Sequence, residues 1–365
     1  MNTRIHALVY GIVLVVLSGC GEGKKEVTAM TTKADSALNA VEKVVADKAQ
    51  EAIVISKDAK TSAEVLQTKI LSGILSAFPT KKVAPHTYVI HGPLEMPNKA
   101  NAGFMNNPAF IVTEKSVVIV DPGSSVQVGR GLVQRVKEVT SNPITHVFNT
   151  HVHGDHWLAN HGIKESFPGA KFYAHPMMIE KAKAGEAEHW IKLMLDLTEN
   201  KTAGTEAVIP ENSVENVQEI KIDNLTIKAH LTGKAHSITD VMYELVEDKL
   251  LFTGDNITYH RIPRMVDGSF VGNIAAADYG LNLSVDVVVP GHGSTGGKEV
   301  LSAYRDYLST IYETSKALAE EGLETYEMKD KLLDKLAVYR DWAGLEEQLG
   351  KHISQSVTEA EEADF

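Results

Sequence analysis

The chain has 365 residues, of which 43% are hydrophobic, so it can bury a large core as one domain or two. Its 36 basic and 48 acidic residues give a formal charge of -12, without a basic stripe. This balance argues against nucleic acid as a partner and against electrostatic binding to a membrane surface. Cys20 is the only cysteine, which excludes an intramolecular disulfide.

Residues 1–19 have the features of an export signal. Arg4 precedes the apolar run Ala7–Leu17, which is too short to span a bilayer as a permanent helix. The run ends in Leu-Ser-Gly-Cys20, which resembles the lipobox of bacterial lipoproteins, in which the cysteine is lipidated. This resemblance predicts a periplasmic protein that binds the membrane through lipidated Cys20, and Gly21 favours the outer membrane. An ordinary cleaved signal peptide with an incidental cysteine is the alternative.

The next two segments precede the main domain. Residues 20–35 are rich in small and charged residues and predict a flexible tether. Residues 36–80 are rich in Ala, Val, Lys and Glu and predict a helical extension, whose stronger helix begins at Thr61 and ends before Pro79. We expect this extension to pack on the main domain, because no heptad repeat is sustained.

Strands and helices alternate through residues 81–300. Apolar runs predict strands at 88–91, 110–113, 117–120, 144–149, 171–174, 220–222, 225–230, 241–245, 249–252 and 285–289, with helices at 126–139 and 176–183. This order predicts a layered α/β domain. The polar stretch 184–215 predicts an inserted helix and loop, a candidate lid, and residues 301–365 predict further helices packed on the domain.

Four metal-ligand residue types crowd into six positions after the strand that ends at Asn149: His151, His153, Asp155 and His156. In extended backbone the first two histidines point to the same side, where they can converge on one ion. A turn at Gly154 directs the carboxylate and the third imidazole towards a second point. We therefore predict a metal site here.

Three more ligand-type residues follow apolar strands and glycine-containing turns: His236, Asp255 and His292. Seven ligands delivered in this way suit a dinuclear site. Imidazole and carboxylate ligands without a thiolate fit two Zn²⁺ best, with iron or manganese as substitutes.

The motif His151-x-His153-x-Asp155-His156, followed by His236, Asp255 and His292, resembles the metallo-β-lactamase superfamily over roughly residues 83–300. The resemblance implies an αββα sandwich with the metals at the sheet edge. It also implies that one ion is held by His151, His153 and His236, the other by Asp155, His156 and His292, with Asp255 as the bridge. Asp121 would support the ligand loop. Ala235 departs mildly from the glycine common before the third histidine.

Two metals that share a water supply a hydroxide nucleophile near neutral pH. By the resemblance, Asp155 would orient this hydroxide as well as bind metal. Tyr259 and His260 follow the bridging residue closely and are further catalytic candidates, for the oxyanion or the leaving group.

The resemblance implies a hydrolase of a small-molecule substrate, and a cyclic amide or ester such as a β-lactam or lactone is the leading prediction. The bridging Asp255 also resembles glyoxalase II, which leaves a thioesterase open, and residues 272–342 are similar to sulfur-oxidation-associated metallohydrolases. A non-catalytic, metal-stabilised binding lipoprotein and a diiron oxygen-reducing site are further alternatives. The oligomeric state is not predicted.

Overall fold

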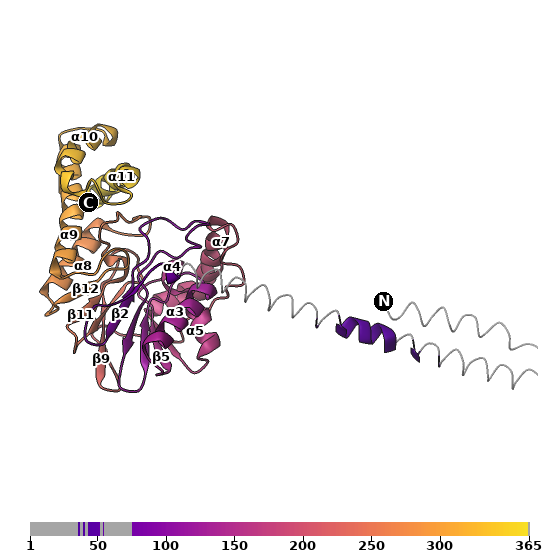
Figure 1. Cartoon of the computed structure of the whole chain (residues 1–365). Helices are drawn as coiled ribbons and strands as arrows, with labels where there is room; N and C mark the ends of the chain where they lie inside the picture. Colours follow the sequence, from indigo (N-terminus) through magenta and orange to yellow (C-terminus); the bar gives the residue numbers. More distant parts are fainter. Residues whose placement is uncertain (1–35, 37–38, 41–42, 52–53, 55–74, 364–365) are drawn as a thin grey trace, which may run out of the picture. The chain divides into compact units, whose positions relative to one another are not determined.

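The structure is a computed structural model. It describes residues 36, 39–40, 43–51, 54 and 75–363 (Figure 1). The chain forms two compact units, Met1–Val65 and Leu66–Phe365, and each is described by itself. In the first unit, residues 43–51 are helical and exposed. The predicted signal peptide and tether, and most of the helix expected from Thr61, lie outside the described residues.

Two β-sheets form the centre of the second unit (Figure 1). The first sheet has the strand order β1 (Thr80–Lys82), β2 (Thr87–Ile90), β3 (Ala109–Val112), β4 (Val117–Val120), β5 (Ile144–Phe148), β6 (Lys171–Ala174) and β7 (Asn212–Ser213). The second has the order β12 (Val287–Val289), β11 (Leu250–Phe252), β10 (Val241–Leu245), β9 (Leu225–Leu231) and β8 (Glu219–Ile222).

The alternation of side chains along each strand creates a core between the two sheets. In β4, Val118 and Val120 point into this core, whereas Val117 and Ile119 belong to a second core on the opposite face. In β10, Tyr243 points into the shared core and Met242 points away from it. The strands β4 and β10, which are apolar on both faces, are therefore covered on both sides.

Helices cover the outer face of each sheet. The helix α3 (Val126–Val139) is capped by Ser125 and packs with α5 (Asn160–Ser166) on the first sheet. On the second sheet lie α8 (Phe270–Asn282) and α9 (Lys298–Glu320). This arrangement confirms the αββα sandwich expected from the sequence.

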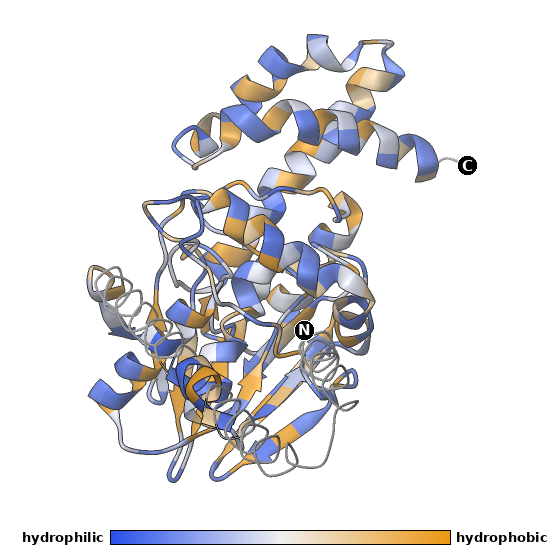
Figure 2. Ribbon diagram, turned by 90° about the vertical axis from the view of Figure 1, so that its right-hand side faces the viewer, coloured by the Kyte–Doolittle hydropathy of each residue, from blue (hydrophilic) through white to orange (hydrophobic). Residues whose placement is uncertain are grey.

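The C-terminal helices continue the core of α8 and α9. They are α10 (Thr325–Lys335), the short 3₁₀ helix η3 (Ala337–Tyr339) and α11 (Leu345–Ala363), and they bury apolar residues such as Leu332, Leu349 and Ile353. Figure 2 shows the corresponding mixture of orange and blue along these helices, as expected for helices with one buried face.

A helical segment begins at Pro176 and continues into the first part of the predicted insertion 184–215. It consists of α6 (Pro176–Lys181), a single π-helical turn η1 (Ala182–Glu186) and α7 (Ala187–Leu197), with Gly185 at φ 120° inside the turn. Among the residues that the structure describes, no helix is long and apolar enough to cross a membrane.

Candidate metal centre

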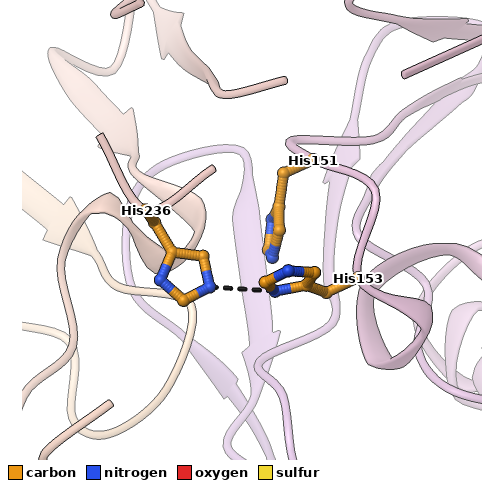
Figure 3. Close-up of side chains that lie close together, drawn as sticks. All are labelled: His151, His153 and His236. Atoms are coloured by element: carbon orange, nitrogen blue, oxygen red, sulfur yellow. Dashed lines mark hydrogen bonds between the residues drawn. The ribbon is translucent and has the colours of Figure 1, made fainter. Parts of the chain in front are cut away.

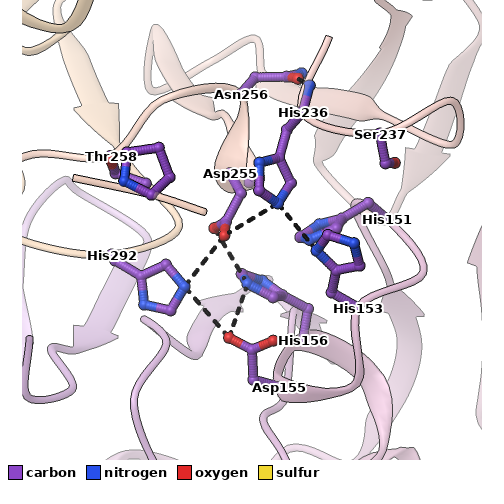
Figure 4. A network of polar contacts seen from close by, with 12 residues as sticks. His151, His153, Asp155, His156, His236, Ser237, Asp255, Asn256, Thr258 and His292 are labelled. Carbon is purple, nitrogen blue, oxygen red and sulfur yellow. Dashed lines mark hydrogen bonds and ion pairs between the residues drawn. The ribbon is translucent and has the colours of Figure 1, made fainter. Parts of the chain in front are cut away.

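The ends of four strands deliver the predicted ligands to one edge of the two sheets. His151 and His153 follow β5, and the short helix α4 (Gly154–Trp157) then carries the neighbouring Asp155 and His156. The other three residues lie after β9, in the 3₁₀ turn η2 (Gly254–Asn256) after β11, and after β12: His236, Asp255 and His292. All seven predicted ligands therefore meet in one place (Figure 4).

Three imidazoles form the first cluster, and their ligand atoms lie within 4.8 Å of one another (Figure 3). His236 Nε2 lies 2.9 Å from His153 Nδ1. The opposite nitrogen, His153 Nε2, lies 3.2 Å from Asp267 Oδ2 and donates to it. His151 Nδ1 donates to Thr150 Oγ1 at 3.0 Å, because that hydroxyl already donates to Asp121. The lone pairs of His151 Nε2 and His153 Nδ1 are thus left for a cation.

The second cluster combines Asp155, His156 and His292, whose ligand atoms also lie within 4.8 Å of one another. Asp155 Oδ2 is 3.4 Å from His156 Nε2 and 3.3 Å from His292 Nε2. His292 Nδ1 donates to the carbonyl oxygen of Met105 at 2.8 Å, which directs Nε2 towards the carboxylates. This cluster is richer in negative charge than the first.

Asp255 lies between the two clusters. Its Oδ1 is 3.2 Å from His156 Nε2, and its Oδ2 is 3.5 Å from His236 Nε2 and 3.3 Å from His292 Nε2. A single carboxylate therefore faces imidazoles of both clusters (Figure 4). This is the position required of a bridging ligand.

Asp121 orients ligands of both clusters without belonging to either. Its Oδ2 accepts from His156 Nδ1 at 2.7 Å and from Thr150 Oγ1 at 2.7 Å, and its Oδ1 accepts from the Thr150 amide at 2.8 Å. Through Thr150 it also fixes the tautomer of His151. The supporting role that the resemblance implies for Asp121 agrees with this geometry.

Glycine is required where the loops carrying Asp255 and His292 meet. A Cβ on Gly291 would collide with Asp255 Oδ1 and with the backbone of Gly254. Gly254 itself has φ +52°, and a Cβ there would collide with Thr150. These two glycines let the ends of β11 and β12 approach the histidine loop closely enough to share a site.

The electrostatics of the two clusters differ. Burial and the neighbouring imidazoles hold the pKa of His151 well below its usual value, and burial lowers the pKa of His236 to about 3. His156 is also buried, which alone would lower its pKa. The carboxylates of Asp255, Asp155 and Asp121 overcome this effect and raise it well above the usual value. His151 and His236 of the first cluster thus favour the neutral form, and the second cluster attracts positive charge.

The donor set fits a pair of metal ions. His151 Nε2 is buried and has no hydrogen-bond partner among the described residues. His156 Nε2 and Asp255 Oδ1 are also buried and form no hydrogen bond with good geometry, although they face each other at 3.2 Å. Buried polar atoms are rarely left without a partner, so this arrangement indicates missing cations. Imidazole nitrogens and carboxylate oxygens without a thiolate are ligands that zinc accepts.

A cavity of about 220 Å³ opens onto this centre. Asp155, Asp255 and three of the predicted ligand histidines line it, together with residues of α7 and of the loop 258–267. Tyr259 and His260 are not among its lining residues. Their rings pack against Trp342 instead, at centroid distances of 5.5 and 5.8 Å. The structure does not bring these two residues to the cavity, and their catalytic role stays a prediction.

Arg261 was not predicted from the sequence, yet it lines the cavity and is buried. Its Nη1 lies 2.9 Å from His292 Nδ1. An arginine six positions after a ligand carries no sequence signal of its own. Thr258, which pairs with His292 as a parallel β-bridge, and Arg261 both line the cavity, whereas Tyr259 and His260 between them do not. The backbone of His260 is left-handed, with φ 61°, so the strand alternation does not continue through this loop.

Comparison with known proteins agrees with this geometry. The sequence model of the metallo-beta-lactamase superfamily matches residues 102–292. A metallo-beta-lactamase type 2 of Bacillus sp. (strain 170) is 22% identical over 214 residues, which cover 56% of this chain and 72% of that protein. A probable metallo-hydrolase of Methanocaldococcus jannaschii is 24% identical over 209 residues, covering 55% and 93%.

The fold is also shared with solved structures. A double mutant of the sec-alkyl sulfatase PisA1 superposes with a TM-score of 0.57 at 18% identity, and the match covers 73% of this chain and 47% of that chain. At this identity the likeness shows the fold alone. The family match spans more than half of the chain and contains all seven predicted ligands, so the chain belongs to the metallo-beta-lactamase superfamily.

Proposed function

We propose that this protein is a di-zinc hydrolase that attacks the acyl carbonyl of a small cyclic amide or ester, a β-lactam or a lactone. The observation that carries the proposal is the convergence of five imidazoles and two carboxylates on two adjacent points at the floor of one cavity. When bound, a pair of zinc ions lowers the pKa of a water towards neutrality and polarises a carbonyl oxygen.

The chain's own residues supply proton handling and orientation. Asp155 belongs to the second cluster and also lines the cavity, so its carboxylate can accept a proton from a water on the cavity side. Asp121 and Thr150 hold the imidazoles in the tautomers that leave their lone pairs facing the clusters. Asp255 balances positive charge between the clusters.

One wall of the cavity is apolar, which supports an organic substrate. The side chains on this wall come from α7 at the spacing of one helical face: Trp190, Leu193, Met194 and Leu197. The Trp190 ring lies 4.9 Å from the His153 ring, so the apolar wall begins directly beside the first cluster. A substrate with an apolar part can therefore rest on α7 while its carbonyl lies over the ligands.

The test is metal analysis combined with a substrate panel. The full chain should bind about two ions and hydrolyse a β-lactam or a lactone in a panel that also contains a thioester and a phosphodiester. Asp155→Ala should keep the fold, as judged by circular dichroism, and lose turnover. The matched control is Asp196→Ala, which removes an exposed carboxylate of α7 that pairs with Lys192. A loaded chain that hydrolyses nothing in the panel contradicts the proposal.

A thioesterase is the second candidate, and Asp255 favours it. This carboxylate faces both clusters, as the ligand set resembling glyoxalase II requires. The thioester in the panel separates the two candidates by their relative kcat/KM. Metal analysis of the same sample distinguishes zinc from iron or manganese and so also tests the diiron alternative.

A non-catalytic binding lipoprotein is the remaining alternative. If Asp155→Ala changes no activity and a partner still binds, this alternative replaces the proposed enzyme.

We also propose a periplasmic location with attachment to the outer membrane through lipidated Cys20. The support is the sequence of residues 1–21, in which an apolar run ends in Leu-Ser-Gly-Cys. Labelling with a radioactive fatty acid should mark the wild-type chain, and Cys20→Ala should abolish the label and release the protein into the soluble fraction. A wild-type chain without label contradicts this location.

A further inference from the structure

Two arginines that are not among the predicted metal ligands line the cavity beside the ligand His292. Arg261 lies on the cavity floor and Arg264 is exposed at the rim, and both line the cavity. Among the described residues, neither guanidinium forms an ion pair with a carboxylate. This is notable in a chain with 48 acidic residues against 36 basic ones.

Arg261 is a buried cation, because only 6% of its surface is exposed. The acceptors around its guanidinium are poor. Its Nη2 lies 3.1 Å from the sulfur of Met96, and a thioether is a weak acceptor. Its Nη1 faces His292 Nδ1, but that nitrogen carries a proton when it donates to Met105 and leaves Nε2 for a metal. The guanidinium therefore lacks the charged acceptor that a buried arginine ordinarily has.

The bound metals strengthen this argument. Asp155 and Asp255 are the nearby carboxylates, and ligation would commit both of them to cations. Arg261 would then add its positive charge to a cavity floor whose acids are already neutralised. A group with a negative charge is the ligand that such a floor attracts, and the planar fork of a guanidinium matches a carboxylate in particular.

We propose that Arg261 binds an oxyanion group of the substrate, of which a carboxylate fits best, while the scissile carbonyl lies over the metal ligands. This inference rests on the proposed hydrolase function and narrows its substrate class to anionic molecules with an apolar part. The apolar part would rest on Trp190 and the other cavity-facing residues of α7.

The binding arm of the test does not depend on turnover. Sodium benzoate and neutral benzamide are titrated by calorimetry into the metal-loaded full chain and into its Arg261→Met and Arg261→Lys variants. We expect benzoate to bind more tightly than benzamide to the wild type. Arg261→Met should weaken benzoate about tenfold or more and leave benzamide unchanged, with a smaller loss for the lysine variant. Arg305→Met is the control, because Arg305 lies on the surface of α9 beside Asp278 and Asp306.

The kinetic arm uses the substrate that the panel identifies, as its free carboxylate and as its methyl ester. Arg261→Met should raise KM for the carboxylate about tenfold, change kcat little, and leave the ester unaffected. Equal binding of benzoate by wild type and Arg261→Met overturns the proposal. So does loss of metal from Arg261→Met, because the arginine would then serve only to support His292. If the panel shows no hydrolysis but the benzoate result holds, the proposed function fails and the anion site stands.

Discussion

Two regions of the molecule hold the cavity in different ways. The ligand frame, residues 102–292, surrounds the centre with short buried hydrogen bonds, of which the three at Asp121 measure 2.7 to 2.8 Å. The C-terminal helices, residues 325–363, lie outside the family match and contain none of the predicted ligands. They hold instead the loop that carries Arg261 and Asp267. Glu359 accepts from the first amides of α8, and His352 donates to the carbonyl of Pro263.

From this difference we expect the ligand frame to determine metal binding and the C-terminal helices to influence substrate preference. The frame brings together all seven predicted ligands, so a change there should remove metal and activity together. The C-terminal helices determine the position of one cavity wall, so a change there should alter stability and substrate preference but leave the metals in place. Four variants or conditions test this division, beginning with the largest expected effect.

Asp255→Ala should have the largest effect, because it removes the one carboxylate that faces imidazoles of both clusters. We expect the bound metal to fall from about two ions to at most about one, and turnover to fall below about 1% of wild type. Mass spectrometry of bound metal and the panel assay measure both. Retention of two ions would show that the carboxylate does not bridge.

Acid should destabilise the C-terminal helices through His352. Burial lowers the pKa of His352 to about 4, below its value of 6.5 in the unfolded chain. The stabilisation is therefore complete above pH 6.5 and is lost as the pH falls towards 4, by up to about 3 kcal/mol at about 1.4 kcal/mol per pH unit. Urea unfolding between about pH 7 and about pH 4 measures this loss.

The variant His352→Gln should reduce the slope of the unfolding free energy against pH. Exposed His189→Gln is the control and should retain the full slope. An unchanged slope in His352→Gln would assign the acid sensitivity to other groups.

Asp121→Asn should weaken metal binding about 10- to 100-fold, because it disturbs the hydrogen bonds that orient His151 and His156. Competition with a chelator measures the affinity. Asp248→Asn is a closely matched control, since Asp248 also contacts a histidine at 2.7 Å and a threonine hydroxyl at 3.2 Å, but these partners, His86 and Thr87, are not predicted ligands. Equal metal affinity in both variants would contradict the orienting role of Asp121.

Glu359→Gln should have the smallest effect. The carboxylate caps the N-terminus of α8 by accepting from the amides of Phe270 and Val271, so its neutralisation should cost about 1 kcal/mol of unfolding free energy. Metal content should not change. Thermal unfolding measures the loss, with the exposed Glu361→Gln as control. Loss of metal from Glu359→Gln would break the separation between the two regions.

The sequence predicted the ligand frame well because its signals are local. Apolar runs marked nearly all the strands, and a strand that ends in a turn carries its next polar residue to the sheet edge, as at Asp255 and His292. Arg261 could not be found in this way, because its importance depends on contacts with Met96 and His292, which are distant in sequence. Proximity to Asp255 in the sequence also predicted a catalytic role for Tyr259. Such proximity does not determine which side chains of a loop face the cavity.

The short strands β1 and β7 gave no sequence signal, since three and two residues cannot display a period. The helix α8 was also missed as a separate element. Its residues are apolar on several sides and include two glycines, so no single stripe marks it.

The backbone pairing at Ala343 links the two regions most directly. Ile262 donates to the Ala343 carbonyl at 2.8 Å, and the Ala343 amide donates to the His260 carbonyl at 3.0 Å. The residues that flank Arg261 are thus tied to a segment that lies outside the family match. Insertions, deletions or substitutions between α9 and α11 could therefore move the arginine without touching a ligand. Under the proposed function, such a molecule can acquire new substrates through changes in its C-terminal segment while its metal-ligand clusters stay intact.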